Sequence, residues 1–368
     1  MRILEAFGEP ISYGGQESFV MNVLENMDRS GITADLLSPY YCDNKGIEEK
    51  IRSWGGEVYT LECSFRPGKN RNSTVSPIRS FLREHHYDVI HIHSGSNSML
   101  AILSKLAYEA GIPRIIVHSH CTGKAGLKHS VSKAVTGRAL SKYPSVYCSC
   151  SKEAGEWRFP RRICRRELNI INNGIDVERF RYNEKVRNKM RSEIGTAENT
   201  LLIGCVGRLT YQKNQSFLLE VLRTVSDLDP EEDCRLIFVG DGEDRSMLEK
   251  KAAELGIQEK VTFTGVVDNV QDYLQALDVA VMPSRYEGLA IAVIEEQAAG
   301  LEILASEAIP ESAAVTGGVA FLPSGDKHKW AQAILKKHVR HPEQADQVAA
   351  NGYSIKETAS VVRRLYAE

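Results

Sequence analysis

Short apolar segments alternate with longer segments of helical periodicity along most of this 368-residue chain. Alternation of this kind predicts parallel β-sheets whose strands are joined by right-handed helical crossovers. The chain is also too long for one ordinary domain and fits two domains of about 150 to 200 residues. We therefore predict an α/β protein with two doubly wound parallel-sheet domains, joined near residues 169–176.

The expected strands divide between the two halves of the chain. In the first half they are residues 3–7, 34–37, 58–61, 89–93, 114–118 and 145–148. In the second half they are residues 201–206, 236–239, 261–263, 279–282 and 303–305. Ligands of doubly wound sheets bind outside the carboxyl ends of the strands, so we expect the functional groups there.

Charge is balanced over the whole chain but uneven along it. The net charge is -2, from 46 Lys and Arg against 48 Asp and Glu, which argues against nucleic acid as a partner. Residues 1–168 hold 23 Lys and Arg against 17 Asp and Glu, and the remainder hold 23 against 31. The first half is therefore basic and can face an anionic surface.

No targeting signal or membrane-spanning segment is recognised in the sequence, so we expect a cytoplasmic protein. No uncharged apolar run approaches the length that spans a bilayer, and Glu5 and Glu9 interrupt the apolar stretch at the N-terminus. The eight cysteines form no CxxC pair, which favours free thiols in a reducing compartment.

The strongest chemical signal is a pair of glutamates, Glu287 and Glu295, with seven residues between them. Glu287 follows an expected strand and turn, and Glu295 lies in the first turns of the next helix. Gly288 and Leu289 would then stand at the helix N-terminus, where free backbone N–H groups bind anions. Carboxylates in these two places can accept hydrogen bonds from a sugar and from a ribose diol. The plainer interpretation is a helix cap and a solvated helix residue.

A second signal is the loop 207–214, which follows an expected strand and precedes a helix. Its Arg208 and Lys213 are five residues apart and can place two cations beside one diphosphate. A basic surface loop is the alternative.

Glycines mark two further strand ends. Gly14 and Gly15 precede the first helix and allow the backbone to approach a phosphate closely. Gly240 and Gly242 also follow a strand, but Arg245 breaks the GxGxxG pattern and no acidic partner for a ribose stands out. We therefore exclude a nicotinamide-dependent enzyme.

Two neighbouring strands end in a histidine pair, His91 with His93 and His118 with His120. Strand alternation puts both members of a pair on the same face. Such pairs can hold a metal, but no carboxylate or third ligand lies nearby in the sequence. We expect core or supporting roles, no metal site, and a single histidine that reaches a reacting sugar.

In combination, these motifs resemble the group 1, family 4 (GT4) retaining glycosyltransferases of the GT-B fold. The motifs occur in the family's order over nearly the whole chain: Gly14-Gly15, Asn173-Gly174-Ile175-Asp176, Gly207-Arg208 with Lys213-Asn214, Gly240-Asp241-Gly242, and Glu287 to Glu295. The last is similar to the family's EX7E signature. The resemblance implies two Rossmann-like domains facing a central cleft. An acceptor domain would span 1–170, completed by a crossover helix at 354–368, and a nucleotide-sugar donor domain would span 171–353.

The resemblance also implies roles for four charged residues. Arg208 and Lys213 would hold the donor diphosphate and stabilise charge on the departing nucleotide. Glu287 would contact hydroxyls of the transferred sugar, and Glu295 would hold the ribose.

Other roles are carried by the backbone and by one histidine. The backbone at Gly288 and Leu289 would assist Glu287 at the donor sugar, and His120 would sit over that sugar. Gly14 and Gly15 would form the loop that closes near the phosphates and the acceptor. Members of the family are usually metal-independent, so we expect no cofactor.

The activity implied is transfer of a hexose-type sugar from a nucleotide-diphosphate donor, with UDP expected, to a hydroxyl of a glycan or lipid-linked acceptor. A role in bacterial surface polysaccharide synthesis is the expected context. Leu289-Ala290 replaces the family's more usual aromatic or proline-containing pair, which leaves the donor sugar open. Two alternatives are a non-catalytic subunit that binds a nucleotide sugar and a nucleotide-sugar epimerase.

A basic segment in the first half raises the question of a membrane. Residues 121–152 contain no Asp or Glu, and four arginines follow. A solvated basic face is the plainer interpretation. The other is peripheral docking to an anionic membrane that bears the acceptor, at about 1 kcal/mol for each charge. The charged residues are Lys124, Lys128, Lys133, Arg138, Lys142, Lys152, Arg161, Arg162, Arg165 and Arg166.

Overall fold

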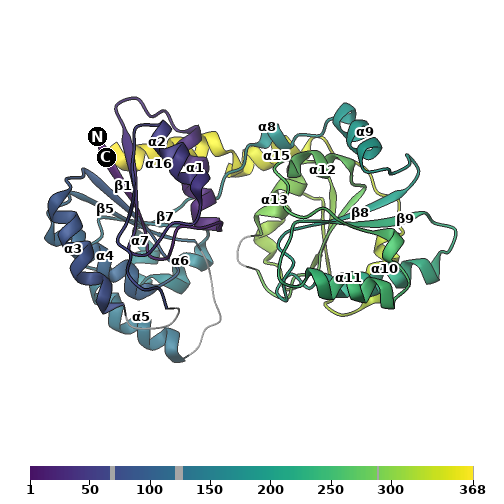
Figure 1. The fold of residues 1–368 in the computed structure, drawn as a ribbon, viewed down its shortest axis with the longest axis horizontal. Helices are drawn as coiled ribbons and strands as arrows, with labels where there is room; N and C mark the ends of the chain where they lie inside the picture. The colour runs from purple at the N-terminus through teal and green to yellow at the C-terminus, as the bar shows by residue number, and fades with distance from the viewer. Residues whose placement is uncertain (67–70, 121–126, 288–289, 368) are drawn as a thin grey trace. The chain divides into compact units, whose positions relative to one another are not determined.

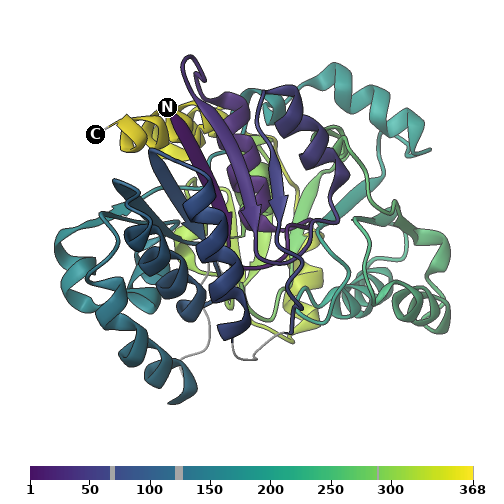
Figure 2. The ribbon, with the colours of Figure 1, turned by 60° about the vertical axis from the view of Figure 1, so that its left-hand side comes forward.

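The computed structural model describes residues 1–66, 71–120, 127–287 and 290–367. The chain divides into two compact units: unit 1 is Met1–Gly174 with Ile355–Glu368, and unit 2 is Ile175–Ser354. Each unit is a parallel sheet covered by helices (Figure 1). The last segment of the chain returns to unit 1, and both views place the N-terminus beside its end (Figures 1 and 2).

Unit 1 contains a seven-stranded parallel sheet in the order β3-β2-β1-β4-β5-β6-β7. The direction of winding reverses between β1 and β4, which pair in parallel and end together at Phe7 and His93. The strands are β1 Arg2–Phe7, β2 Thr33–Ser38, β3 Val58–Thr60, β4 Val89–His93, β5 Arg114–Ser119, β6 Val146–Ser149 and β7 Leu168–Ile170.

Strand alternation gives this sheet an apolar core on each face. In β1, Leu4 and Ala6 pack on one face, and Ile3 and Phe7 pack on the other beneath α1 and α16. The α-helices in the described part of this unit are α1 Gly15–Asn26, α2 Lys45–Ser53, α3 Val75–Glu84, α4 Asn97–Glu109, α5 Leu127–Leu140, α6 Lys152–Arg158, α7 Arg161–Arg166 and α16 Ile355–Ala367.

Unit 2 repeats the same winding with six parallel strands in the order β10-β9-β8-β11-β12-β13. Here the reversal lies between β8 and β11, which are neighbours. The strands are β8 Leu201–Val206, β9 Cys234–Val239, β10 Val261–Phe263, β11 Val279–Met282, β12 Glu302–Ser306 and β13 Val319–Leu322. The helices are α8 Val177–Phe180, α9 Glu184–Glu193, α10 Gln215–Leu228, α11 Arg245–Glu254, α12 Val270–Ala276, α13 Ile291–Ala298, α14 Lys327–Ile334 and α15 Gln344–Val348.

Every strand expected from the sequence is present, and the structure adds β7 and β13. Both are edge strands, and neither has a residue that is fully buried. The other two edge strands, β3 and β10, also have no fully buried residue and were expected, and β13 is itself an apolar run, Val319–Leu322.

Two further expectations concern the whole chain. Among the described residues, no helix is both long enough and apolar enough to cross a membrane. The seven cysteines that the structure describes are all free thiols, and Cys121 lies outside the described residues.

Candidate active site

The loops that follow β8 and β11 meet at the point where the winding of unit 2 reverses. Asn214 adopts a left-handed backbone conformation, with φ of 58°, and its Nδ2 donates to the carbonyl of Pro283 at 3.1 Å. The backbone N–H of Arg285 donates to the carbonyl of Gln212 at 2.8 Å. These bonds fix the two loops to each other, so side chains from both share one site.

Glu287 is held by side chains from both loops. Its Oε1 lies 2.8 Å from Nζ of Lys213 and accepts from Oγ of Ser284 at 2.8 Å. Its Oε2 accepts from Nε2 of Gln212 at 3.4 Å. Because the Glu287 side chain is only 8% exposed, this pairing offsets the cost of burying its charge.

Arg208 lies in the same loop as Lys213. It is exposed, and its guanidinium has no ion-pair or hydrogen-bond partner within the described parts of the chain. The site therefore offers one paired cation, Lys213, and one available cation, Arg208, at the carboxyl end of the sheet. A bound anion can engage both.

The glycines after β9 serve packing at this site. A Cβ on Gly240 would lie 2.4 Å from the carbonyl oxygen of Gly207, and one on Gly242 would lie 2.2 Å from that of Leu209. The 240–242 stretch therefore needs glycine to pack against the 207–209 backbone, which accounts for the incomplete dinucleotide pattern.

Helix α13 carries two adjacent carboxylates, Glu295 and Glu296. Burial raises the pKa of Glu295 to about 7, with Arg179 opposing the shift. Burial and the neighbouring Glu295 raise the pKa of Glu296 to about 8, and Lys213 opposes it. Both oxygens of Glu296 are buried and have no hydrogen-bond partner among the residues that the structure describes. The first turn expected at Gly288 and Leu289 lies outside the described residues, and the helix begins at Ile291.

The two glycines predicted in unit 1 stand at the start of α1. Gly14 is the N-cap residue, and Gly15 begins the helix. A Cβ on Gly14 would lie 2.5 Å from Oε2 of Glu17, whereas one on Gly15 would meet nothing within 4 Å. The Glu17 carboxylate also accepts from the backbone N–H of Ser12 at 3.2 Å. This helix N-terminus therefore already has a carboxyl group beside it, and a side chain at position 14 would have to displace the flexible end of Glu17.

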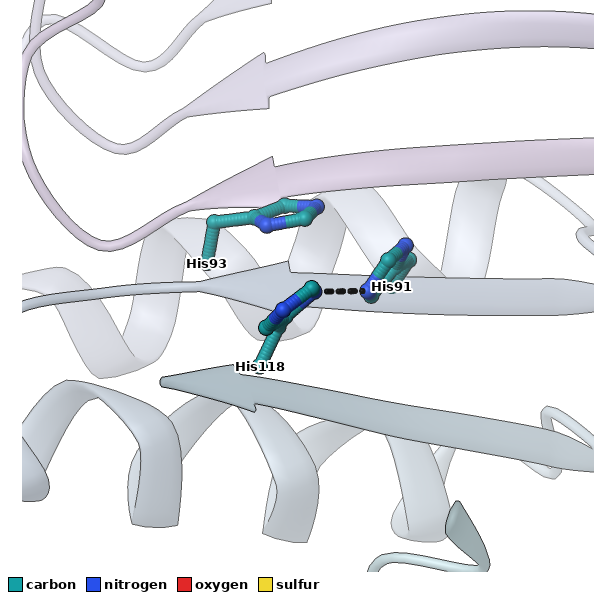
Figure 3. A group of neighbouring side chains, drawn as sticks. All are labelled: His91, His93 and His118. Carbon is teal, nitrogen blue, oxygen red and sulfur yellow. Dashed lines mark hydrogen bonds between the residues drawn. The ribbon is translucent and has the colours of Figure 1, made fainter. Parts of the chain in front are cut away.

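The four predicted histidines come together on the face of the unit 1 sheet that α1 and α16 cover. His91 and His93 end β4, and His118 lies beside them on β5 (Figure 3). His91 Nε2 lies 3.2 Å from His118 Nδ1, and His93 Nδ1 lies 2.7 Å from His120 Nε2. His120 follows β5 directly and is half-buried.

Two residues that the sequence analysis did not select complete this cluster. Glu5 of β1 accepts from Tyr366 of α16 at 2.5 Å through Oε1, and its Oε2 lies 2.8 Å from Nε2 of His93. Tyr366 also lies 3.0 Å from Nδ1 of His91. A glutamate inside the apolar run of β1 was a signal for Glu5, but nothing near Tyr366 in the sequence points to it.

The cluster also has the spacing of a metal site. His91, His93 and His118 each offer one nitrogen, and these three atoms lie within 4.8 Å of one another. Yet both nitrogens of His91 and both of His93 already have hydrogen-bond partners in the cluster.

The sequence is similar to those of known glycosyltransferases. A model of the group 1 glycosyl transferases matches residues 200–337, and a model of glycosyltransferase family 4 matches residues 13–179. The putative glycosyltransferase EpsF of Bacillus subtilis is 29% identical over 333 residues, covering 88% of this chain and 84% of EpsF. A UDP-Gal:alpha-D-GlcNAc-diphosphoundecaprenol alpha-1,3-galactosyltransferase of Escherichia coli is 25% identical over 270 residues, covering 71% of this chain and 67% of that protein.

The fold has a match among solved structures. The crystal structure of Anabaena Alr3699/HepE in complex with UDP aligns with a TM-score of 0.79 at 17% identity, covering 100% of both chains. Two Rossmann-like parallel-sheet units of this kind are the GT-B fold. The two family models together span most of the sequence, and the chain belongs to the group 1, family 4 glycosyltransferases.

Proposed function

We propose that this glycosyltransferase moves a hexose-type sugar from a UDP-sugar to a hydroxyl of a glycan or lipid-linked acceptor, with retention of configuration and without a metal ion. The observation that carries the proposal is the ion pair of Lys213 with Glu287 beside the available Arg208, at the carboxyl ends of β8 and β11. In this proposal unit 2 binds the donor and unit 1 binds the acceptor.

The chemistry needs stabilisation of the leaving group more than it needs a strong base. As the glycosidic bond breaks, negative charge develops on the departing diphosphate. Arg208 can grip phosphate oxygens through its planar fork, and Lys213 adds a point charge. Two fixed cations supply the charge that a divalent ion supplies elsewhere, which is why we propose that no metal is needed.

We propose that retention arises from attack on the same face and not from a covalent intermediate on Glu287. Glu287 is engaged by Lys213, Ser284 and Gln212, so we assign it to hydroxyls of the donor sugar and not to nucleophilic attack. The acceptor hydroxyl would attack from the face that the nucleotide leaves, and a phosphate oxygen would take its proton.

The proposal of UDP and of a lipid-linked acceptor draws on the similar proteins. The Anabaena protein was crystallised with UDP, and the Escherichia coli relative acts on a diphosphoundecaprenol-linked sugar. Glu295 on α13 would hold the ribose of the nucleotide.

We also propose that unit 1 docks on the inner face of the membrane through α5 and the segments after it. Val131 and Val135 of α5 are 55% and 75% exposed, and Arg138 and Lys142 are exposed close by in the chain. Exposed apolar side chains next to basic ones suit an anionic bilayer surface. Salt-sensitive sedimentation with anionic vesicles, and none with zwitterionic vesicles, is the expected result. Equal behaviour with both vesicle types would contradict it.

The first experiment is a calorimetric titration of the purified protein with UDP, GDP and ADP in the presence of EDTA. We expect UDP to bind in the micromolar range and Glu295→Ala to weaken that binding. Binding of none of the three would refute the donor site. Binding that requires a divalent cation would refute metal independence.

Turnover assays then separate the alternatives. Release of UDP from a UDP-sugar that depends on an added acceptor supports transfer, and the anomeric configuration of the product tests retention. Conversion of the donor sugar without an acceptor would identify an epimerase. Binding without turnover across a panel of donors and acceptors would identify a non-catalytic subunit.

A further inference from the structure

The histidine cluster of unit 1 is a continuous chain of hydrogen bonds with a carboxylate at its centre. One branch runs from Glu5 through His93 to His120, with distances of 2.8 Å and 2.7 Å. The other runs from Glu5 through Tyr366 and His91 to His118, with distances of 2.5 Å, 3.0 Å and 3.2 Å. Figure 3 shows the three strand histidines with their rings turned toward one another.

Both branches end in an unpartnered nitrogen. Nε2 of His118 and Nδ1 of His120 are buried and have no hydrogen-bond partner in the described residues. The two rings stack with their centroids 4.1 Å apart. The hydrogen bonds along each branch therefore determine whether each of these two nitrogens carries a proton or a lone pair.

The proton count along each branch is fixed by the chemistry of its members. Burial raises the pKa of Glu5, while His91 and the hydrogen bond from Tyr366 oppose the shift. With Glu5 ionised, its carboxylate only accepts, and a phenol has one proton to give. Tyr366 gives its proton to Glu5 and must accept from Nδ1–H of His91. His91 Nε2 is then a lone pair that accepts from Nδ1–H of His118, which leaves Nε2 of His118 bare.

The same count applies to the other branch. Glu5 accepts from Nε2–H of His93, so Nδ1 of His93 is a lone pair that accepts from Nε2–H of His120. Nδ1 of His120 is left bare. Burial lowers the pKa of all four imidazoles, that of His93 to about 3, so each ring is neutral at pH 7 and carries one proton.

We propose that Glu5 is a positioning residue that acts through His93 to hold His120 in the Nε2–H tautomer, so that Nδ1 meets a sugar hydroxyl as a hydrogen-bond acceptor. The inference rests on the proposed function for the identity of that hydroxyl. The tautomer itself follows from the hydrogen bonds with Glu5 ionised and the four imidazoles neutral. A carboxylate that fixes a histidine tautomer is worth about 10⁴-fold in rate in the serine proteases.

A metal ion is a poorer account of the same residues. Six of the eight imidazole nitrogens in the cluster have a partner, and the two that do not belong to His118 and His120. Three histidine ligands would therefore break at least one of the observed bonds.

Glu5→Gln tests the proposal with almost no change of shape. A carboxylate accepts from both branches, but an amide has one acceptor atom and one donor atom. One branch must therefore reverse in Glu5→Gln, and either Nδ1 of His120 or Nε2 of His118 must gain a proton. Nitrogen-15 correlation spectra of histidine-labelled protein read this directly and require no substrate.

The expected result is two bare terminal nitrogens in the wild type and one of them protonated in Glu5→Gln. When the reversal falls on His120, kcat for transfer should fall by about tenfold or more, while the Kd for UDP stays within about twofold. Tyr366→Phe is the matched control, since it keeps the carboxylate and should leave His120 unchanged.

Three results would overturn the proposal. They are a protonated Nδ1 on His120 in the wild type, unchanged tautomers at both ends in Glu5→Gln, and about one equivalent of zinc in the purified protein that is lost in His91→Ala. A wild type that shows the expected tautomers but transfers no sugar would instead refute the proposed function and leave the tautomer assignment standing.

Discussion

The pKa of Glu295 predicts that donor binding depends on pH in the physiological range. If the carboxylate accepts two hydrogen bonds from the ribose, only its ionised form binds well. With a pKa of about 7, the ionised fraction falls from about nine-tenths at pH 8 to about one-tenth at pH 6. The Kd for the donor should therefore rise by about tenfold, or about 1.4 kcal/mol, between pH 8 and pH 6.

The assay is calorimetric titration with UDP-glucose at pH 6, 7 and 8. UDP itself is less suitable because its terminal phosphate titrates near pH 6. Glu295→Gln cannot ionise, and its weaker binding should be flat over the same range. Glu296→Gln is the matched control, because it removes the adjacent carboxylate and should keep the pH dependence. A wild-type Kd that stays constant within twofold from pH 6 to pH 8 would refute the reasoning.

Three further predictions concern the stability of unit 2. The pKa of Glu296 in the folded protein is about 8, above its usual 4.5, so the wild type loses stability as the pH rises from about 4.5 to about 8. Glu296→Gln should therefore raise the Tm at pH 9 and leave it unchanged at pH 4. An equal gain at both pH values would contradict this. Gly204→Ala places a Cβ 2.1 Å from Cδ1 of Leu277 and should cost about 1–3 kcal/mol in urea unfolding. An unchanged midpoint would count against it. Asp278→Asn removes the negative charge that accepts a hydrogen bond from Nη1 of buried Arg191 at 3.1 Å. The free energy of unfolding should fall by about 3 kcal/mol, and a fall of less than about 1 kcal/mol would refute the prediction.

The central strands could be predicted from the sequence because burial on both faces leaves a continuous apolar run. The expected 89–93, 201–206 and 279–282 coincide with β4, β8 and β11. The edge strands β3 and β10 were also expected, although they, like the missed β7 and β13, have no fully buried residue, so exposure does not separate the two pairs. The strand order itself is not written in any local pattern, although the alternation with helices restricts it to parallel winding.

The residues of the candidate site could be predicted from the sequence, but the interactions between them could not. Loop position after a strand selected Lys213 and Glu287, but their direct pairing depends on β8 and β11 being neighbours, which only the fold reveals. The histidine pairs were visible as a pattern. Their connection through Glu5 and Tyr366 joins residues 361 positions apart, and no spacing in the sequence encodes it. The roles assigned to Arg208 and Glu295 stay predictions.

Helix α16 has a consequence for how this protein is made. Ile355, Ala359, Val362 and Tyr366 fill the core beneath α1, yet they are synthesised only after the whole of unit 2. Domains usually fold in the order of synthesis. Here unit 2 is complete in the nascent chain first, while unit 1 must wait with one sheet face only partly covered and Glu5 without its tyrosine until α16 has been made. A nascent chain of this enzyme therefore exposes the part of its first-made sheet that α16 will cover for the whole time that its second unit is being synthesised.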